Sequence, residues 1–209
     1  MSNPPAVKRK TQQPREVTVR KRQDILKAAL QTFGSRGYKA GSLAEIAEQV
    51  GITHAGVLHH FGSKDQLLLD VLAYRDESDV AHLEGKHIPD GRELFTHLVA
   101  TAALNSTRPG IVQAFAVLAA DSVTDDHPAQ EFFRQRYAGL RLEVGTALRE
   151  VAGERGVSED VVDDAAASIL AVMDGLQVQW LLAPAEVDLA RATSFAIEGI
   201  LAAALATRS

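Results

Sequence analysis

The chain has 209 residues, of which 46% are hydrophobic and 23% are charged, and it contains no cysteine. This length and apolar content can form one large domain or a small domain joined to a larger one. The absence of cysteine excludes a disulfide framework, a thiolate metal site and a cysteine nucleophile.

Charge is divided unevenly along the chain. Residues 1–64 hold eleven Lys and Arg against four Asp and Glu, a net charge of +7, whereas the remainder holds eleven against 23, a net charge of −12. A basic head on an acidic body indicates a polyanionic partner for the head, although a basic tail without a partner has the same charge pattern. We expect a cytoplasmic protein, since the basic N-terminus precedes no apolar run and no stretch reaches about 18 unbroken apolar residues.

The N-terminal elements are predicted from breakers and caps. Residues 1–16, polar, basic and proline-containing, are expected to form a flexible arm. A helix over 17–33 follows, with Gly34 and Gly37 predicted to stop it. Ser42 and Glu45 have the spacing of a capping box at the start of a helix over 43–50. Further caps predict a helix over 53–60 and a longer helix that begins at Lys64.

Every later element is also predicted to be helical. Because no run of alternating β-branched residues occurs, we expect an all-α fold. The predicted helices cover 90–105, 110–122, 128–153, 158–183 and 186–206, separated by Gly and Pro residues.

Residues 44–61 have the spacing of a helix-turn-helix. Ala47 is small enough for two helices to cross closely, Gly51 permits the positive φ of a tight turn, and Val57 can fill the angle between the helices. The second helix of such a motif enters the major groove of DNA. The alternative is an ordinary pair of short packed helices, which the basic head and the flanking segments make less favoured.

The predicted DNA contacts follow from this placement. Hydroxyl and imidazole groups can bond base edges or phosphates, small residues permit close approach, and helix N-termini favour phosphate. The predicted contact residues are Ser42, Thr53, His54, Ala55, Gly56, Leu58, His59 and Lys64.

Residues from about Arg20 to Val71 resemble the N-terminal pattern of the TetR family of regulators. The matching segments are ILKAALQTF at 25–33, GY at 37–38, SLAEIA at 42–47, VGIT at 50–53 and FGSKDQL at 61–67. The resemblance implies about nine helices, with a three-helix DNA-binding head over 17–64 and an effector-binding, dimerising domain over 65–209. It also implies a homodimer that reads a pseudo-palindromic operator.

One residue departs from the family pattern. The family usually has a tyrosine that binds phosphate where this chain has Leu58. Leucine cannot donate that hydrogen bond, so His59 or the basic arm must compensate if affinity is to be kept.

An effector pocket is predicted in the C-terminal domain, where aromatic residues and a few polar groups share apolar helices. Packing in an ordinary core is the alternative for each of them. The candidate lining residues are Phe95, Phe115, Tyr137, Met173, Gln177 and Trp180.

The last two helices each carry an apolar stripe. The stripes contain Val161, Ala165, Ile169, Val172 and Leu176 in the first, and Leu189, Thr193, Ala196, Ile197, Ile200 and Ala204 in the second. One chain could bury both stripes internally, but a two-fold four-helix bundle between two chains is predicted to bury them better.

No metal site, cofactor or catalytic centre is predicted. Adjacent His59 and His60 point about 100° apart on a helix, and neither a zinc-protease motif nor a nucleophile motif occurs. The sequence therefore predicts a ligand-responsive regulator, with an operator, a small-molecule effector and a second copy as partners. The alternatives are a helical carrier or enzyme with an incidental basic arm, and a nucleoid-type binder without sequence preference.

Overall fold

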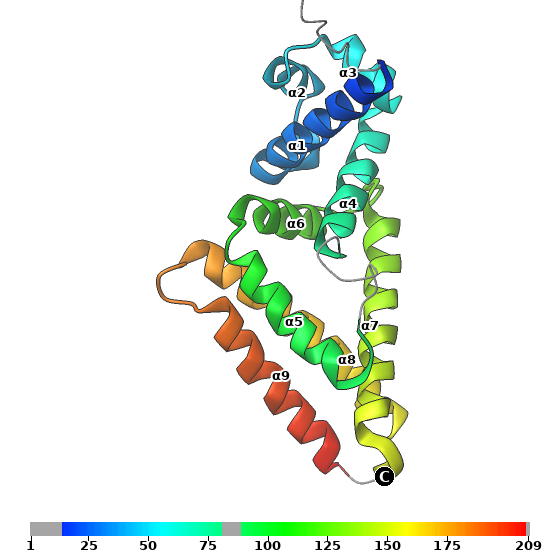
Figure 1. Cartoon of the computed structure of the whole chain (residues 1–209), viewed down its shortest axis with the longest axis vertical. Coiled ribbons are helices and arrows are strands. Elements are labelled where there is room, and N and C mark those ends of the chain that lie inside the picture. Colours follow the sequence, from blue (N-terminus) through cyan, green and yellow to red (C-terminus); the bar gives the residue numbers. More distant parts are fainter. Residues whose placement is uncertain (1–13, 81–88, 208–209) are drawn as a thin grey trace, which may run out of the picture.

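The computed structural model describes residues 14–80 and 89–207, which form nine α-helices, one 3₁₀ turn and no strand. The helices are α1 (Pro14–Ala40), α2 (Leu43–Gln49), α3 (His54–Phe61), α4 (Lys64–Val80), α5 (Gly91–Asn105), α6 (Pro109–Asp121), α7 (Gln130–Ala152), α8 (Glu159–Leu182) and α9 (Leu189–Ala206). The all-α prediction is confirmed. Helices α1, α2 and α3 form a head at one end, α6 lies directly beneath it, and α5, α7, α8 and α9 form the body (Figure 1).

The predicted ends of α1 were wrong at both sides. The helix begins at Pro14, inside the predicted arm, whose residues 1–13 lie outside the described chain. It also continues through Gly34, which is buried against α6, where an added Cβ would lie 2.6 Å from the Ala114 Cβ. Gly34 therefore permits close helix packing. Gly37 does interrupt the helix, since its φ of 72° is in the left-handed region that favours glycine.

The head and α6 share one apolar core. Its fully buried side chains include Ile25 and Phe33 of α1, Ile46 of α2 and Leu68 of α4, and the same cluster contains Leu118 of α6. Because α1 packs more extensively against α6 than any other two helices pack in the described chain, the head is joined to the body by a hydrophobic contact as well as by α4.

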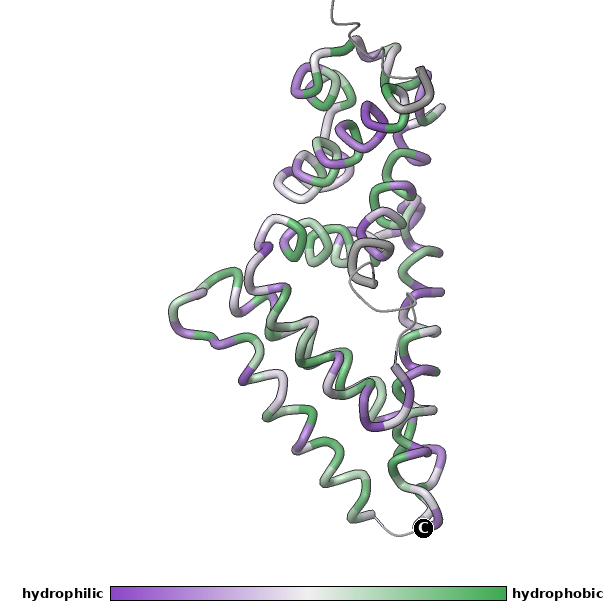
Figure 2. Tube along the Cα trace, viewed as in Figure 1, coloured by the Kyte–Doolittle hydropathy of each residue, from purple (hydrophilic) through white to green (hydrophobic). Residues whose placement is uncertain are grey.

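The predicted stripes of the last two helices are used within the chain. Ala165, Ile169, Leu189, Thr193, Ile197 and Ala204 are buried in the single chain, where α8 packs against α7 and α9, and α9 also packs against α5. The chain therefore buries much of both stripes by itself, as the internal alternative allowed, while Val161, Val172, Leu176, Ala196 and Ile200 are half-buried. Hydrophobic residues nevertheless extend along most of both helices (Figure 2), and a different face remains exposed, with Val178, Leu182 and Phe195 on it.

Both α8 and α9 are long and apolar enough, by length and composition alone, to cross a membrane. Part of this apolar content lies in the core of the body, because α8 packs against α7 and α9, and α9 also packs against α5.

Candidate DNA-binding head and effector cavity

The helix-turn-helix has the geometry that its small residues predict. Ala47 and Val57 are buried at the crossing of α2 and α3, and Gly51 has a φ of 67° in the turn between them. An L side chain rarely adopts this φ, so glycine is favoured at the turn. The Ile52 N–H donates to the Ala47 carbonyl at 3.0 Å, which closes the turn.

Side-chain caps fix where the short helices begin. The Thr53 hydroxyl accepts a hydrogen bond from the Gly56 N–H at 3.0 Å, and the Ser63 hydroxyl accepts one from the Gln66 N–H at 3.0 Å. Ser42 accepts from the Ala44 N–H at 3.1 Å, whereas Glu45 forms an ion pair with Arg36 at 3.2 Å. The predicted reciprocal capping box is therefore replaced by a one-sided cap.

The outer face of α3 is accessible and carries no acidic residue. Thr53, His54, Ala55 and His59 are exposed, and Gly56 is half-exposed. Leu58 is also half-exposed, but it packs against the head core as well. His60 is less exposed than His59. Burial is the main cause that lowers the pKa of His60, and the nearby charges of His59, Arg22 and Lys21 lower it further. The folded head therefore disfavours the charged form of this imidazole.

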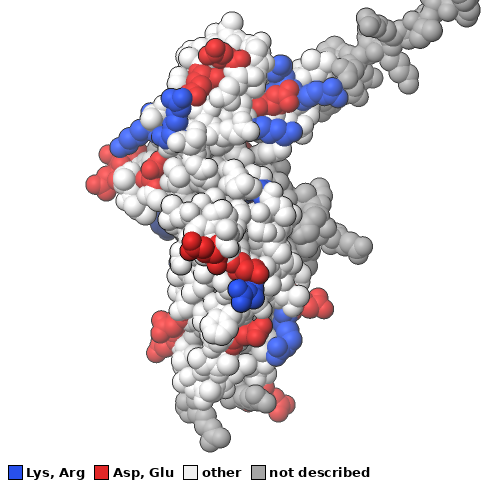
Figure 3. All heavy atoms as spheres, turned by 90° about the vertical axis from the view of Figure 1, so that its left-hand side faces the viewer, with Lys and Arg blue, Asp and Glu red and all other residues white. Residues whose placement is uncertain are grey.

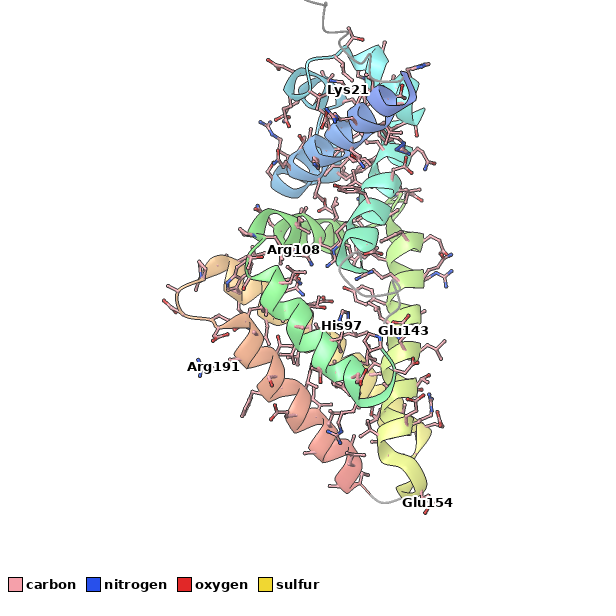
Figure 4. The ribbon with its side chains drawn as sticks, in the orientation of Figure 1. Lys21, His97, Arg108, Glu143, Glu154 and Arg191 are labelled. Atoms are coloured by element: carbon pink, nitrogen blue, oxygen red, sulfur yellow. The ribbon has the colours of Figure 1, made fainter. Side chains whose placement is uncertain are left out.

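Basic residues around α3 are partly engaged inside the head, which the sequence did not indicate. Arg22 forms an ion pair with Asp70 at 2.6 Å and stacks 4.4 Å from the centre of the Phe61 ring. Lys21, labelled in Figure 4, donates to the Val50 carbonyl at 3.2 Å. Lys64 donates to the Lys39 carbonyl at 3.3 Å. Part of the positive charge of the head thus stabilises its own packing.

A polar cluster joins the head to the body. The Tyr38 N–H donates to the Asp121 carboxylate of α6 at 3.2 Å, and the Tyr38 hydroxyl donates to Asp65 of α4. The edge of His127 packs against the Tyr38 ring with 5.2 Å between centroids. One residue near the end of α1 therefore contacts α4 and the turn before α7 through its side chain, and α6 through its backbone N–H.

The body contains a cavity of about 620 Å³ between α4, α5, α6, α7 and α8. His97 on α5 and Glu143 on α7 both line it and reach into the space between these helices (Figure 4). Of the predicted pocket residues, Phe115, Tyr137, Met173 and Gln177 line the cavity. Phe95 and Trp180 do not line it. They are buried in two separate apolar clusters, Phe95 with Leu94 and Leu148 and Trp180 with Val112 and Leu189.

Charged residues that the sequence analysis did not single out form one wall of this cavity. Asp76 of α4 accepts from Arg75 at 3.1 Å and from Arg136 of α7 at 2.7 Å. Both guanidinium groups stack on the Phe115 ring of α6, at 4.1 Å and 4.9 Å from its centroid. No motif marks such a cluster, because its members come from three helices.

The described residues contain no group of three His, Asp or Glu side chains placed to hold a metal ion. His82 and His87 lie outside the described residues.

Comparisons with known proteins agree with both parts of the structure. The family model of bacterial regulatory proteins of the tetR family matches residues 25–71, and that of the C-terminal domain of BetI-type transcriptional repressors matches residues 92–205. A relative named as the probable HTH-type transcriptional regulator ArpR of Pseudomonas putida is 30% identical over 189 residues, covering 80% of this chain and 83% of ArpR.

Two solved structures share the fold. A transcriptional regulator from Rhodococcus sp. Rha1 superposes with a TM-score of 0.71 at 23% identity, covering 89% of this chain and 98% of that one. A regulator from Saccharomonospora viridis in complex with choline superposes with a TM-score of 0.68 at 22% identity, covering 87% and 96%. The helix-turn-helix head, the helical body and these matches together show that the chain belongs to the TetR family of transcriptional regulators.

Proposed function

We propose that this regulator represses transcription as a homodimer, with two heads docked on an inverted-repeat operator and a small molecule in the body cavity causing release. The proposal rests on the position of α4, which runs from the head to the cavity. This one helix begins at Lys64 in the head and brings Arg75 and Asp76 to the cavity wall. An occupant of the cavity therefore touches the helix that orients the head.

DNA contact is proposed for the exposed face of α3 and for the flanking helix N-termini, namely Ser42, Thr53, His54, Ala55, Gly56, Leu58, His59 and Lys64. The caps on Ser42 and Thr53 leave the hydroxyl hydrogens able to donate to phosphate. The division into a head over 17–64 and a body over 65–209 agrees with the separate roles, although α4 and the shared core join the two parts.

The proposed dimer interface is the apolar face left exposed on α8 and α9. Leu182 and Phe195 are each 82% exposed, which is unusual for large apolar side chains. The face turned to the viewer in Figure 3 has white surface between separate groups of acidic and basic side chains. A second copy packed there would form a four-helix bundle from two α8–α9 pairs.

Release requires the effector to prefer one head spacing over the other. In the proposed mechanism, an occupant of the cavity shifts α4 relative to α6 and α7, and the spacing of the heads follows. No catalytic step is proposed, and the protein is placed in the cytoplasm with its DNA.

The test of DNA binding is selection of sequences from a random duplex pool, followed by titration at several salt concentrations. An inverted repeat with an affinity that falls steeply with salt is expected, because two heads contact many phosphates. His54→Ala and His59→Ala should change base preference if these side chains read base edges. Binding without selectivity would favour a nucleoid-type protein, and no binding would favour a carrier.

The test of the interface is sedimentation at micromolar concentration. Phe195→Asp should dissociate the dimer, because it places a charge in an apolar contact. Val123→Asp is the matched control, since Val123 is 78% exposed but lies in the turn after α6. A wild-type monomer, or equal effects of the two substitutions, would contradict the interface.

A further inference from the structure

The chemistry of the cavity occupant is indicated by Asp174, a partly buried acid on α8 that lines the cavity. Its carboxylate accepts one hydrogen bond from the Tyr137 hydroxyl at 2.6 Å. A carboxylate offers about four acceptor positions, so this bond leaves Asp174 able to accept further donors from the cavity. Burial raises the pKa of Asp174, against the lowering effects of Tyr137, Arg136 and Arg75. Its ionised form is thus poorly solvated and is stabilised by any cation that approaches.

The two arginines of the cavity wall are held by other groups. Both guanidinium groups bond to Asp76 and both stack on Phe115, at the end of the cavity formed by α4 and α6. The lining contains two arginines and three carboxylates, which belong to Asp76, Glu143 and Asp174. Counting Asp, Glu, Lys and Arg alone, the lining carries a formal net charge of −1, and a bound anion would add to that excess.

The remaining wall favours an apolar body. Leu98, Phe132, Leu140, Leu170 and Met173 line the same cavity as Asp174. An aromatic ring can stack on such residues, and rings such as Phe132 and Tyr137 also attract cations through their π-faces. A volume of about 620 Å³ is in the range of cavities that enclose drug-sized molecules.

We infer that the effector is an organic cation, an ammonium or amidinium group on an apolar, ring-containing body, with Asp174 as the residue that binds the charge. This inference rests on the proposed function of the cavity as the effector site. It does not rest on the choline-bound relative, since a likeness at 22% identity carries only the fold.

The test uses three probes that share one ring system and differ in charge: 2-(1-naphthyl)ethylamine, 2-(1-naphthyl)ethanol and 1-naphthylacetate. Binding of each to the full chain is measured by titration calorimetry at pH 7. The amine should bind at least about tenfold more tightly than the alcohol, because a charge-assisted hydrogen bond in a cavity exceeds a neutral one. The carboxylate should bind most weakly.

Asp174→Asn keeps the volume and an oxygen that can accept from Tyr137, and it should reduce the amine-to-alcohol ratio to about one. Asp164→Asn is the matched control, because Asp164 is an exposed acid on the same helix, and its ratio should equal that of the wild type. Tighter binding of the alcohol or the carboxylate to the wild type, or an unchanged ratio in Asp174→Asn, overturns the cation assignment and leaves the cavity as an effector site. The wild-type series decides the assignment even if the variant does not fold. Failure of all three probes to bind overturns both proposals.

Discussion

The head and the cavity differ in how far apart in sequence their functional residues lie. The proposed DNA contacts all fall within residues 42–64, on α3, at the N-caps of α2 and α3, and at the first residue of α4. The cavity residues extend from Arg75 to Gln177 and come from five helices. A site built from one segment has its geometry fixed by local rules of turns and caps, whereas a site built from five helices depends on how they pack.

The head and the body nevertheless share one apolar core. Disrupting that core should have the largest effect on the free energy of unfolding. Phe33 is fully buried in the core that the head shares with α6. Phe33→Ala should lower the free energy of unfolding by about 3–5 kcal/mol, through lost apolar burial and the cavity left behind. Urea unfolding followed by circular dichroism measures the change. A single transition shifted as a whole is expected; separate transitions for head and body would contradict a shared core.

A smaller substitution tests the contact between α1 and α6 directly. Gly34→Ala places a Cβ 2.6 Å from the Ala114 Cβ and 2.7 Å from its Cα, so the two helices must separate. We expect a loss of about 1–3 kcal/mol in thermal or urea unfolding, as for other overpacked cores.

Gly139→Ala is the control for this effect. Gly139 lies within α7 and its added Cβ would meet no atom within 4 Å. Alanine is favoured over glycine in a helix by about 1 kcal/mol, so this variant should be more stable than the wild type. If Gly34→Ala were also stabilising, the close approach of α1 and α6 would not be required.

The glycines of the head show how much of the fold can be predicted from the sequence. Gly37 and Gly51 both have positive φ, at the helix break and the tight turn that local pattern predicted for them. Gly34 has the same identity but its role depends on Ala114, 80 positions later, so the pattern gave the wrong helix end. The same distinction holds for the cavity. Tyr137 and Met173 could be predicted as lining residues because they are aromatic or apolar residues on helices. The Arg75–Asp76–Arg136 cluster and the absence of Trp180 from the lining depend on how the helices pack, which no local pattern encodes.

The polar cluster between head and body should make stability depend on pH. Burial lowers the pKa of His127 from its ordinary 6.5, with Asp121 and Asp65 opposing this and Lys39 adding to it. Its Nδ1 accepts from the Ala129 N–H at 3.2 Å, and among the described residues its buried Nε2 has no hydrogen-bond partner. The folded state therefore favours the neutral imidazole, packed against Tyr38.

The sign of the effect follows from the lowered pKa. The unfolded chain takes up the proton first as the pH falls, so the contribution to stability is present above pH 6.5 and is lost as the pH falls from there through the folded-state pKa. One proton gives a slope of at most about 1.4 kcal/mol per pH unit. Unfolding at pH 5 to 8 should show a shallower slope for His127→Asn, whose side-chain oxygen can still accept from Ala129. Parallel slopes for the two proteins would show that His127 does not titrate in this way.

The smallest expected effect is a change in DNA affinity on substitution of Leu58, which tests how α3 docks on DNA. This residue is half-exposed on α3 and also packs against the head core. If α3 docks as the family resemblance implies, a phosphate lies near it, and leucine offers packing without a hydrogen-bond donor. Leu58→Tyr should strengthen binding by about 0.5–1.5 kcal/mol, because the new bond replaces a water contact.

A phosphate contact carries no sequence information, so the gain from Leu58→Tyr should be similar for operator and scrambled duplexes titrated at one salt concentration. His54→Ala provides the contrast, since loss of a base contact should weaken operator binding more than binding to the scrambled duplex. Unchanged or weaker binding of Leu58→Tyr to both duplexes, with the unfolding transition intact, would mean that Leu58 serves the core of the head. The phosphate would then be bound elsewhere, and the docking inferred for α3 would be wrong at this residue.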